Sequence, residues 1–140
     1  CGLAQLEKAP AFIQKRKDNF KFLKERLKSC EEFLILPQVT ENSDPSWFGF
    51  PITLRDTSDV TRNDLVKYLD QEKVGTRLLF AGNLTRQPYM IGRAFRVSGD
   101  LNNSDVVMNN TFWIGLQPAL TEEMLDYSVQ KIQTFLGVNF

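Results

Sequence analysis

The chain has 140 residues, of which 42% are hydrophobic and 24% are charged, as in one ordinary globular domain that is long enough to bury a core. Seventeen basic and seventeen acidic residues cancel, which argues against a nucleic-acid binder or a membrane anchor that works through bulk positive charge. The absence of histidine removes histidine-based triads, general bases and metal ligands from this chain. No apolar run approaches the roughly 18 residues of a membrane span.

The two cysteines, Cys1 and Cys30, are too few for a cysteine-rich metal site or an iron–sulfur cluster. A disulfide between them is one alternative. Cys30 has the position of a small apolar residue at the end of a helix, so a reduced, cytoplasmic protein is the simpler expectation. The chain lacks an initiator methionine and a signal peptide and opens within helix-like sequence, so we expect a piece of a longer polypeptide.

The first third of the chain predicts two helices. Residues 3–8 have helical composition, and Pro10 suits the first turn of a second helix of about five turns. The other face of this second helix is rich in lysine, and a solvated surface is favoured there over an anionic partner because the overall charge is zero. The inward face, read from three- and four-residue spacing, comprises Phe12, Ile13, Arg16, Phe20, Leu23, Leu27 and Cys30.

A strand and a third helix follow. After a polar loop at 38–46, residues 47–54 alternate in the manner of a strand, and Pro51 places this strand at a sheet edge or at a bulge. Trp47 and Phe48 open the strand, either as core aromatics or as the wall of a pocket. Residues 61–64 resemble a capping box, and Gly75 is the expected stop signal of the helix that follows. The residues predicted to face inward on this helix are Leu65, Val66 and Leu69.

The rest of the chain predicts two more strands and a last helix. Residues 78–80 have the length of a buried strand, and residues 111–116 form another apolar strand. Between them, residues 88–104 fit no single pattern, and Ser104 is placed to cap a single helical turn. The last helix runs from its cap at Thr121 to a stop at Gly137. Its predicted apolar stripe is Met124, Ser128, Ile132, Phe135 and Leu136.

The mixture of helices and strands, without a regular βαβ repeat, predicts an α+β fold in which a small, mostly antiparallel sheet packs on helices. The least generic stretch is 74–89, where Gly82 and Asn83 indicate a turn and Pro88 interrupts regular structure. We expect a strand that delivers Asn83, Arg86 and Gln87 onto a loop. Arginine and amide groups in such a place suit phosphate, carboxylate or sugar oxygens, although a surface hairpin with solvated arginines gives the same pattern.

Several segments together resemble the C-terminal part of the DegT/DnrJ/EryC1/StrS family of sugar aminotransferase-like proteins. They are Gly2 to Lys8, PSWFGFPI (45–52), VGTRLLFAGNLTRQPY (74–89) and FWIGLQPALTEEM (112–124). The sequence is most similar to the branch of nucleotide-sugar 3-dehydrases of lipopolysaccharide biosynthesis that act on CDP-4-keto-6-deoxy-D-glucose. The resemblance covers essentially the whole chain, and GTRLLFAGNLTRQP is its most specific motif.

The resemblance implies a fold-type I enzyme with a large, cofactor-holding domain and a small C-terminal domain that closes over it. Residues 1–30 would then be connecting helices, and residues 31–140 the small domain. It implies pyridoxamine phosphate as the cofactor, bound by the large domain beside a histidine, and a possible iron–sulfur cluster, also outside this chain. A flavin and iron–sulfur reductase and a second subunit would be its partners.

For this chain, the resemblance and the residue chemistry together suggest substrate binding without catalytic or cofactor-binding residues. The expected contacts with the diphosphate and sugar hydroxyls are Arg77, Asn83, Arg86 and Gln87, with Trp47 and Phe48 beside the sugar. Two alternatives stay open: the small domain of a nucleotide-sugar aminotransferase, in which the large domain carries lysine instead of histidine, and a non-catalytic binding or dimerisation module. Nucleic acid and membranes are not expected partners.

Overall fold

The computed structural model describes residues 2–56 and 60–138. Cys1, and with it the question of a disulfide to Cys30, lies outside these residues. The helices are α1 (Gly2–Leu6), α2 (Ala9–Arg26), α3 (Arg62–Gln71), α4 (Asn102–Asn110) and α5 (Glu122–Leu136). The strands are β1 (Leu34–Ile35), β2 (Gly49–Leu54), β3 (Thr76–Leu78) and β4 (Thr111–Gly115), and short 3-10 turns lie at Lys28–Cys30, Leu84–Arg86 and Pro88–Met90.

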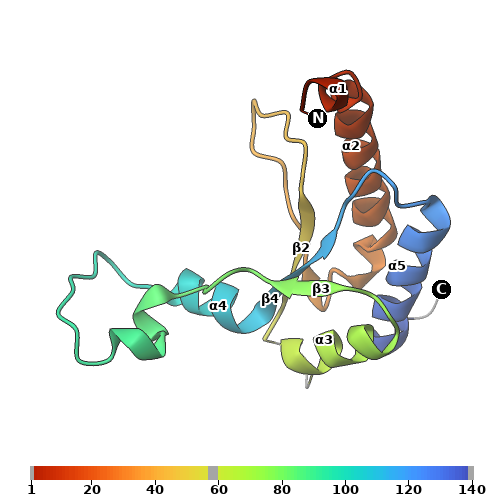
Figure 1. The fold of residues 1–140 in the computed structure, drawn as a ribbon. Helices are drawn as coiled ribbons and strands as arrows, with labels where there is room; N and C mark the ends of the chain where they lie inside the picture. Colours follow the sequence, from red (N-terminus) through yellow and green to blue (C-terminus); the bar gives the residue numbers. More distant parts are fainter. Residues whose placement is uncertain (1, 57–59, 139–140) are drawn as a thin grey trace.

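The four strands form one antiparallel sheet in the order β1-β2-β4-β3. Helices α2, α3 and α5 pack together against one of its faces, while α4 and the turns before it project to the side (Figure 1). This arrangement confirms the predicted α+β fold with a small antiparallel sheet packed on helices. The core consists of the inward side chains of the sheet and of these three helices, including Leu23, Phe50, Leu69, Phe112 and Ile132.

Strand β2 shows how the residue pattern positions the sheet. Phe50, Ile52 and Leu54 alternate inward and are almost fully buried, because successive strand residues point to opposite faces. The expectation that Pro51 forces an edge position is wrong, since β2 lies between β1 and β4. The two-residue strand β1, which the sequence did not predict, pairs only with residues 53 and 54. One side of β2 is therefore unpaired at Pro51, and no ladder hydrogen bond is lost.

The predicted helix ends are mostly confirmed. Thr61 and Asp64 form the complete capping box of α3, and Thr121 caps α5 by accepting a hydrogen bond from the Met124 backbone N–H. Gly137, at φ 67°, ends α5. The stop of α3 was assigned wrongly: Lys73 adopts the left-handed conformation, at φ 63°, whereas Gly75 does not have a positive φ.

Two inward faces were predicted correctly only in part. On α2 and the turn that follows it, Phe20, Leu23, Leu27 and Cys30 are buried as predicted, but Phe12 and Ile13 are exposed because the core contacts begin further along the helix. On α5, Ile132 and Leu136 are buried as predicted, but Met124 is 55% exposed. The buried residues of α5 are Leu125, Val129, Ile132, Gln133 and Leu136.

The largest departure from the sequence prediction is a projecting arm, which we define as residues 79–110 (Figure 1). Its first leg leaves β3 through the two 3-10 turns, its tip is an exposed loop, and its second leg is α4, which returns to β4. A strand is present here, but it lies at Thr76–Leu78 and not at 78–80. It is not buried as predicted, because Leu78 and Phe80 are 52% and 91% exposed. Pro88 starts a 3-10 turn instead of ending regular structure, and α4 replaces the single turn expected at Ser104.

Candidate substrate-binding surface

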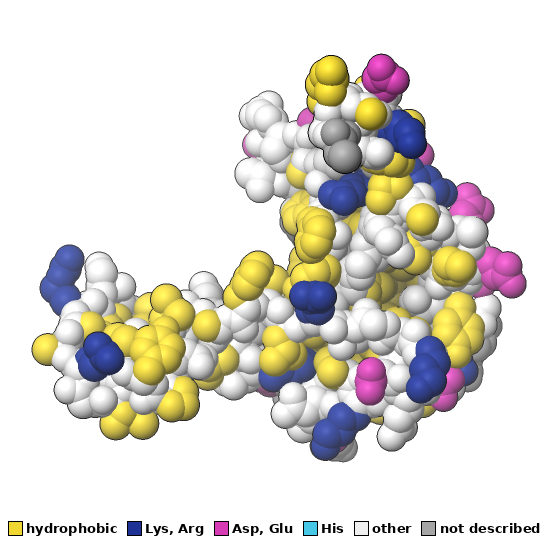
Figure 2. All heavy atoms as spheres, viewed as in Figure 1, with side chains coloured by type: hydrophobic (Ala, Val, Ile, Leu, Met, Phe, Trp, Pro, Cys, Tyr) yellow, Lys and Arg dark blue, Asp and Glu magenta, His cyan; other side chains and the backbone are white. Residues whose placement is uncertain are grey.

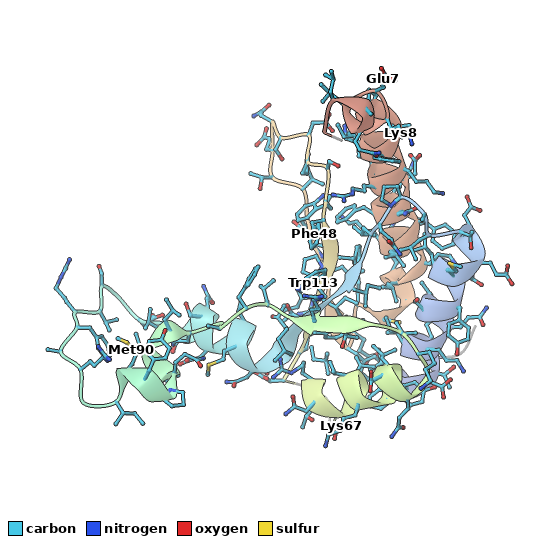
Figure 3. The ribbon with its side chains drawn as sticks, viewed as in Figure 1. Glu7, Lys8, Phe48, Lys67, Met90 and Trp113 are labelled. Atoms are coloured by element: carbon cyan, nitrogen blue, oxygen red, sulfur yellow. The ribbon has the colours of Figure 1, made fainter. Side chains whose placement is uncertain are left out.

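Two aromatic and two cationic side chains form a cluster that extends from helix α2 to the sheet face opposite helices α2, α3 and α5. We call that sheet face the open face. Trp113 of β4 pairs with Pro51 of β2 on one side and with Arg77 of β3 on the other, so the side chains of Trp113 and Arg77 both project from the open face. Figure 3 shows Trp113 and Phe48 together near the corner where the arm leaves the body.

Trp113 is fixed by close contacts on the open face. A Cβ atom added to Gly49 would lie 2.2 Å from the Cε3 atom of Trp113, so the indole ring occupies the space that a side chain at position 49 would fill. The indole N–H donates to the Leu78 carbonyl oxygen at 3.3 Å. Phe48, which is 68% exposed, contacts Trp113 with ring centroids 5.3 Å apart. Glycine at position 49 is thus required for this aromatic pair to form.

Arg16 of α2 completes the cluster. Its guanidinium carbon lies 5.6 Å from the ring centroid of Phe48, within the range of a cation–π contact. Its Nε atom is buried and has no hydrogen-bond partner. Within residues 2–56 and 60–138, neither Arg16 nor Arg77 forms an ion pair. The cluster therefore holds two positive charges that no carboxylate of the described chain neutralises by direct contact.

These four residues line one groove with a volume of about 1090 Å³. The groove continues past the start of β3 to the first turns of α5, where Lys73, Leu120, Thr121, Glu123, Met124 and Tyr127 line it. The space-filling view shows hydrophobic side chains next to cationic ones on the body of the molecule where the arm joins it (Figure 2). A surface with this mixture fits a ligand that is both flat and anionic.

A second polar cluster holds the base of the arm together. The Asp105 carboxylate accepts hydrogen bonds from Asn83 Nδ2 at 2.7 Å, and from Arg86 Nε and Nη2 at 3.2 and 3.0 Å. The bond from Arg86, and after it the bond from Asn83, lowers the pKa of Asp105 below its usual value. Asn83 Oδ1 in turn accepts from the backbone N–H of Thr85. These bonds tie the two legs of the arm to each other.

The six residues expected at the substrate are divided between these places. Phe48 and Arg77 lie in the groove, whereas Trp47 stacks on Phe20 at a centroid distance of 4.9 Å. Asn83 is only 2% exposed, and Gln87 donates from Nε2 to the Ala81 carbonyl oxygen at 2.9 Å. The structure therefore brings Phe48 and Arg77 together around Trp113, and it gathers Asn83, Arg86 and Gln87 at the base of the arm.

Sequence reasoning missed Arg16, Trp113 and Asp105. Arg16 occurred among apolar residues on the predicted inward face of a helix, and an arginine in that position was a usable signal. Trp113 looked like any aromatic of an apolar strand, and nothing in the sequence indicated that it faces away from the helices. Asp105 is 19 residues from Arg86, and its pairing depends on the path of the arm, which the sequence left undefined.

This chain offers no lysine amine suited to a covalent link with a pyridoxal-type cofactor. None of the lysines is buried in the part of the chain that the structure describes, and such a link uses a desolvated lysine. The chain also contains no histidine. The described residues also contain no group of three or more acidic, cysteine or histidine side chains that could hold a metal ion. None of the helices in these residues is long and apolar enough to cross a membrane.

This sheet, with helices on one face and an open second face, is found in enzymes with the pyridoxal-phosphate-dependent aminotransferase-like fold. The structure of the *E. coli* GDP-4-keto-6-deoxy-D-mannose-3-dehydratase with bound hydrated PLP matches 94% of this chain and 33% of its own, with a TM-score of 0.82 at 26% identity. The aminotransferase from *Psychrobacter cryohalolentis* shares the fold at a TM-score of 0.84 and 16% identity, over 97% of this chain and 37% of its own.

The chain belongs to the DegT/DnrJ/EryC1/StrS aminotransferase family, whose model matches residues 1–133. It is 61% identical over all 140 residues to the lipopolysaccharide biosynthesis protein RfbH of *Salmonella typhimurium*, of which it covers 32%. It is 44% identical over 136 residues, 97% of this chain, to the dTDP-4-dehydro-2,6-dideoxy-D-glucose 3-dehydratase of *Saccharopolyspora spinosa*, of which it covers 29%. The chain thus spans about a third of the length of these relatives.

Proposed function

We propose that this chain is the C-terminal, substrate-binding part of a nucleotide-sugar 3-dehydratase. The proposed enzyme removes the C3 hydroxyl of CDP-4-keto-6-deoxy-D-glucose in the synthesis of 3,6-dideoxyhexoses for O-antigen. The observation that carries the proposal is the 61% identity to a lipopolysaccharide biosynthesis protein along the whole chain. A named 3-dehydratase at 44% identity supports the reaction type.

In this proposal, the small domain begins at residue 31, and residues 1–30 connect it to a large domain. Exposed apolar side chains of α1 and of the start of α2 support a contact with further protein, because contiguous apolar surface of this kind is usually covered. Leu3, Leu6, Phe12 and Ile13 are 82%, 66%, 41% and 43% exposed. The full-length protein would pair with a second subunit through both domains and work with a flavin and iron–sulfur reductase, and any iron–sulfur cluster would lie outside this chain.

Pyridoxamine phosphate supplies an amine and an electron-accepting ring when it is bound. This chain offers no buried lysine for a covalent link to that group, so we assign it to the large domain and give this chain the task of holding the substrate. Phe48 and Arg77 would contact the substrate from the groove. Arg86 would contact it from the arm: a guanidinium has five N–H donors, and only its Nε and Nη2 atoms bond to Asp105. Trp47, Asn83 and Gln87 would hold these contacts in place.

The reaction can be tested in the full-length polypeptide that carries this chain, incubated with pyridoxamine phosphate, CDP-4-keto-6-deoxy-D-glucose, and a flavin and iron–sulfur reductase with its electron donor, which supplies the two electrons of the C3 deoxygenation. We expect loss of the C3 hydroxyl, detected by mass spectrometry and NMR of the sugar. Formation of a 4-amino sugar in the presence of L-glutamate would instead establish the aminotransferase alternative. An unchanged substrate under both conditions would favour a non-catalytic module.

Arg77→Ala gives a clean test of the substrate role, because Arg77 has no ion-pair partner in the described structure. A charged hydrogen bond to phosphate is worth about 1.5–3 kcal/mol, so kcat/KM should fall by about 10- to 100-fold. Lys67→Ala on α3 is the matched control: Lys67 is exposed and lies away from the groove (Figure 3). The same kcat/KM in both variants would remove Arg77 from the site. Arg86→Ala should also lower kcat/KM, and unchanged kinetics would remove Arg86.

A further inference from the structure

The groove on the open face contains more positive charge than the described protein neutralises. Arg16, Lys73 and Arg77 line it, and Glu123 is the single carboxylate among the lining residues. None of the three cations forms an ion pair within the described parts of the chain. By contrast, the arm arginine, Arg86, is paired with Asp105. Cations that remain unpaired and gather in one hollow favour an anion from outside the chain.

Aromatic side chains lie directly beside these charges. Arg16 is over the Phe48 ring, Phe48 contacts Trp113, and Arg77 is the cross-strand neighbour of Trp113. From α2 to the open face, the order is therefore cation, ring, ring, cation. Rings such as Phe and Trp provide stacking surfaces for any nucleobase, and a guanidinium can bond two phosphate oxygens at once.

We infer that Arg16 and Trp113, together with Phe48 and Arg77, bind the nucleoside diphosphate end of the substrate in this groove. The inference rests on the proposed function and deepens it by assigning two residues and a ligand moiety that the proposed function does not include. The two rings contact the base, and the two arginines contact the diphosphate. The keto sugar then extends toward the arm, where Arg86 is exposed.

The geometry supports a ligand in this groove in two ways. A groove of about 1090 Å³ is at the upper end of the range for small-molecule sites, so a nucleoside diphosphate fits. Arg16 also forms no ion pair within the described residues, although its guanidinium has five N–H donors. A diphosphate supplies both the acceptor atoms and the charge that the groove lacks.

Isothermal titration calorimetry of the full-length polypeptide, with CDP and inorganic pyrophosphate as separate probes, tests the assignment. Trp113→Ala should weaken CDP binding about tenfold, because stacking on one base contributes roughly 1–3 kcal/mol, and it should leave pyrophosphate binding unchanged. Arg16→Ala should weaken the binding of both probes about tenfold or more. Trp113→Tyr, which keeps an aromatic ring, should retain most of the CDP affinity.

Lys21→Ala is the matched control for Arg16→Ala, because Lys21 is an exposed cation on the same helix that does not line the groove. It should bind both probes as the wild type does. Circular dichroism and the melting temperature identify any variant that has lost its fold, and Trp113→Tyr and Arg16→Lys then replace the alanine changes.

The outcomes separate this inference from the proposed function. If wild-type protein binds CDP and the Arg16 and Trp113 variants bind it equally well, the groove is not the nucleotide site, although the proposed function survives. If Trp113→Ala weakens both probes to the same extent, the assignment of the base to the rings is wrong. If the wild-type protein turns over a nucleotide sugar with a different base and does not bind CDP, the proposed CDP substrate fails, and the groove variants are then measured with that nucleotide.

Discussion

Gly82 lies in the first leg of the arm and packs against the second leg, and replacing it with alanine should destabilise the arm through two separable effects. Its backbone is left-handed, at φ 63°, a conformation that costs an alanine about 1–2 kcal/mol. A Cβ at this position would also lie 2.4 Å from both the Cα and the Cβ of Met108 in α4. Because part of that contact is backbone, α4 must shift, and overpacking of this kind costs about 1–3 kcal/mol.

Gly92→Ala is a control that contains only the first effect. Gly92 has a similar φ of 75°, but nothing lies within 4 Å of the position that its Cβ would occupy. Gly92→Ala should therefore lower the free energy of unfolding by at most about 1–2 kcal/mol. Gly82→Ala should lower it by about 2–5 kcal/mol, a large part of the 5–15 kcal/mol typical of a whole protein.

Urea denaturation of the two variants measures this difference, and hydrogen exchange of the α4 amides shows where it acts. We expect Gly82→Ala to unfold at a lower urea concentration than Gly92→Ala and to exchange the α4 amides faster. Equal unfolding free energies for the two variants would refute the reasoning, since the contact with Met108 would then contribute nothing.

Three further changes test individual features by thermal or urea unfolding. Lys73→Gly should raise the free energy of unfolding by about 0.5–1 kcal/mol, because Lys73 holds a left-handed conformation at the end of α3. Gly75→Ala should leave the free energy of unfolding almost unchanged. If Gly75→Ala destabilises the protein and Lys73→Gly does not stabilise it, Gly75 is the residue that ends the helix. Thr61→Ala removes the capping box of α3 and should cost about 1 kcal/mol, whereas Thr40→Ala in an exposed loop should cost almost nothing; similar losses would argue against the cap. The pKa of Asp105 is lowered in the folded protein, so its stabilising contribution is present above the usual pKa of about 4 and is lost as the pH falls through the lowered value. The difference in melting temperature between wild type and Asp105→Asn should therefore shrink on acidification from neutral pH, and a constant difference would contradict this role.

The sequence predicted those parts of the fold in which local signals and burial agree. The caps at Thr61 and Thr121 depend on neighbouring residues only, and they were located correctly. The alternation of Phe50, Ile52 and Leu54 follows from having one covered sheet face. The helix caps and the strand alternation can both be recognised in the sequence without knowledge of contacts between distant residues.

The incorrect predictions of burial and strand position have a common physical cause: contacts between residues far apart in the sequence determine these properties. Leu78 and Phe80 have strand-like composition, but the chain there leaves the sheet to start the arm, so they are exposed. Pro51 is compatible with an inner strand because β1 is too short to reach it. Met124 and Leu125 are adjacent in the sequence, and only the orientation of α5 against the sheet determines which of the two side chains is buried.

The candidate site was predicted in part for the same reason. Phe48 and Arg77 were chosen for their chemistry, and the sheet brings both to one groove. Their shared neighbour, Trp113, is separated from each of them by at least 36 positions in the sequence and became visible only through the strand pairing.

The two tryptophans of this chain occupy contrasting surroundings, which makes them natural optical reporters. Trp47 is stacked on Phe20 in the body of the domain, and Trp113 lies in the groove on the open face. Quenching or a spectral shift of the indole emission from a Trp47→Phe protein would follow events at the groove, whereas a Trp113→Phe protein would report on the packing of α2 against β2. One chain therefore allows ligand occupancy and unfolding to be followed separately, without an attached dye.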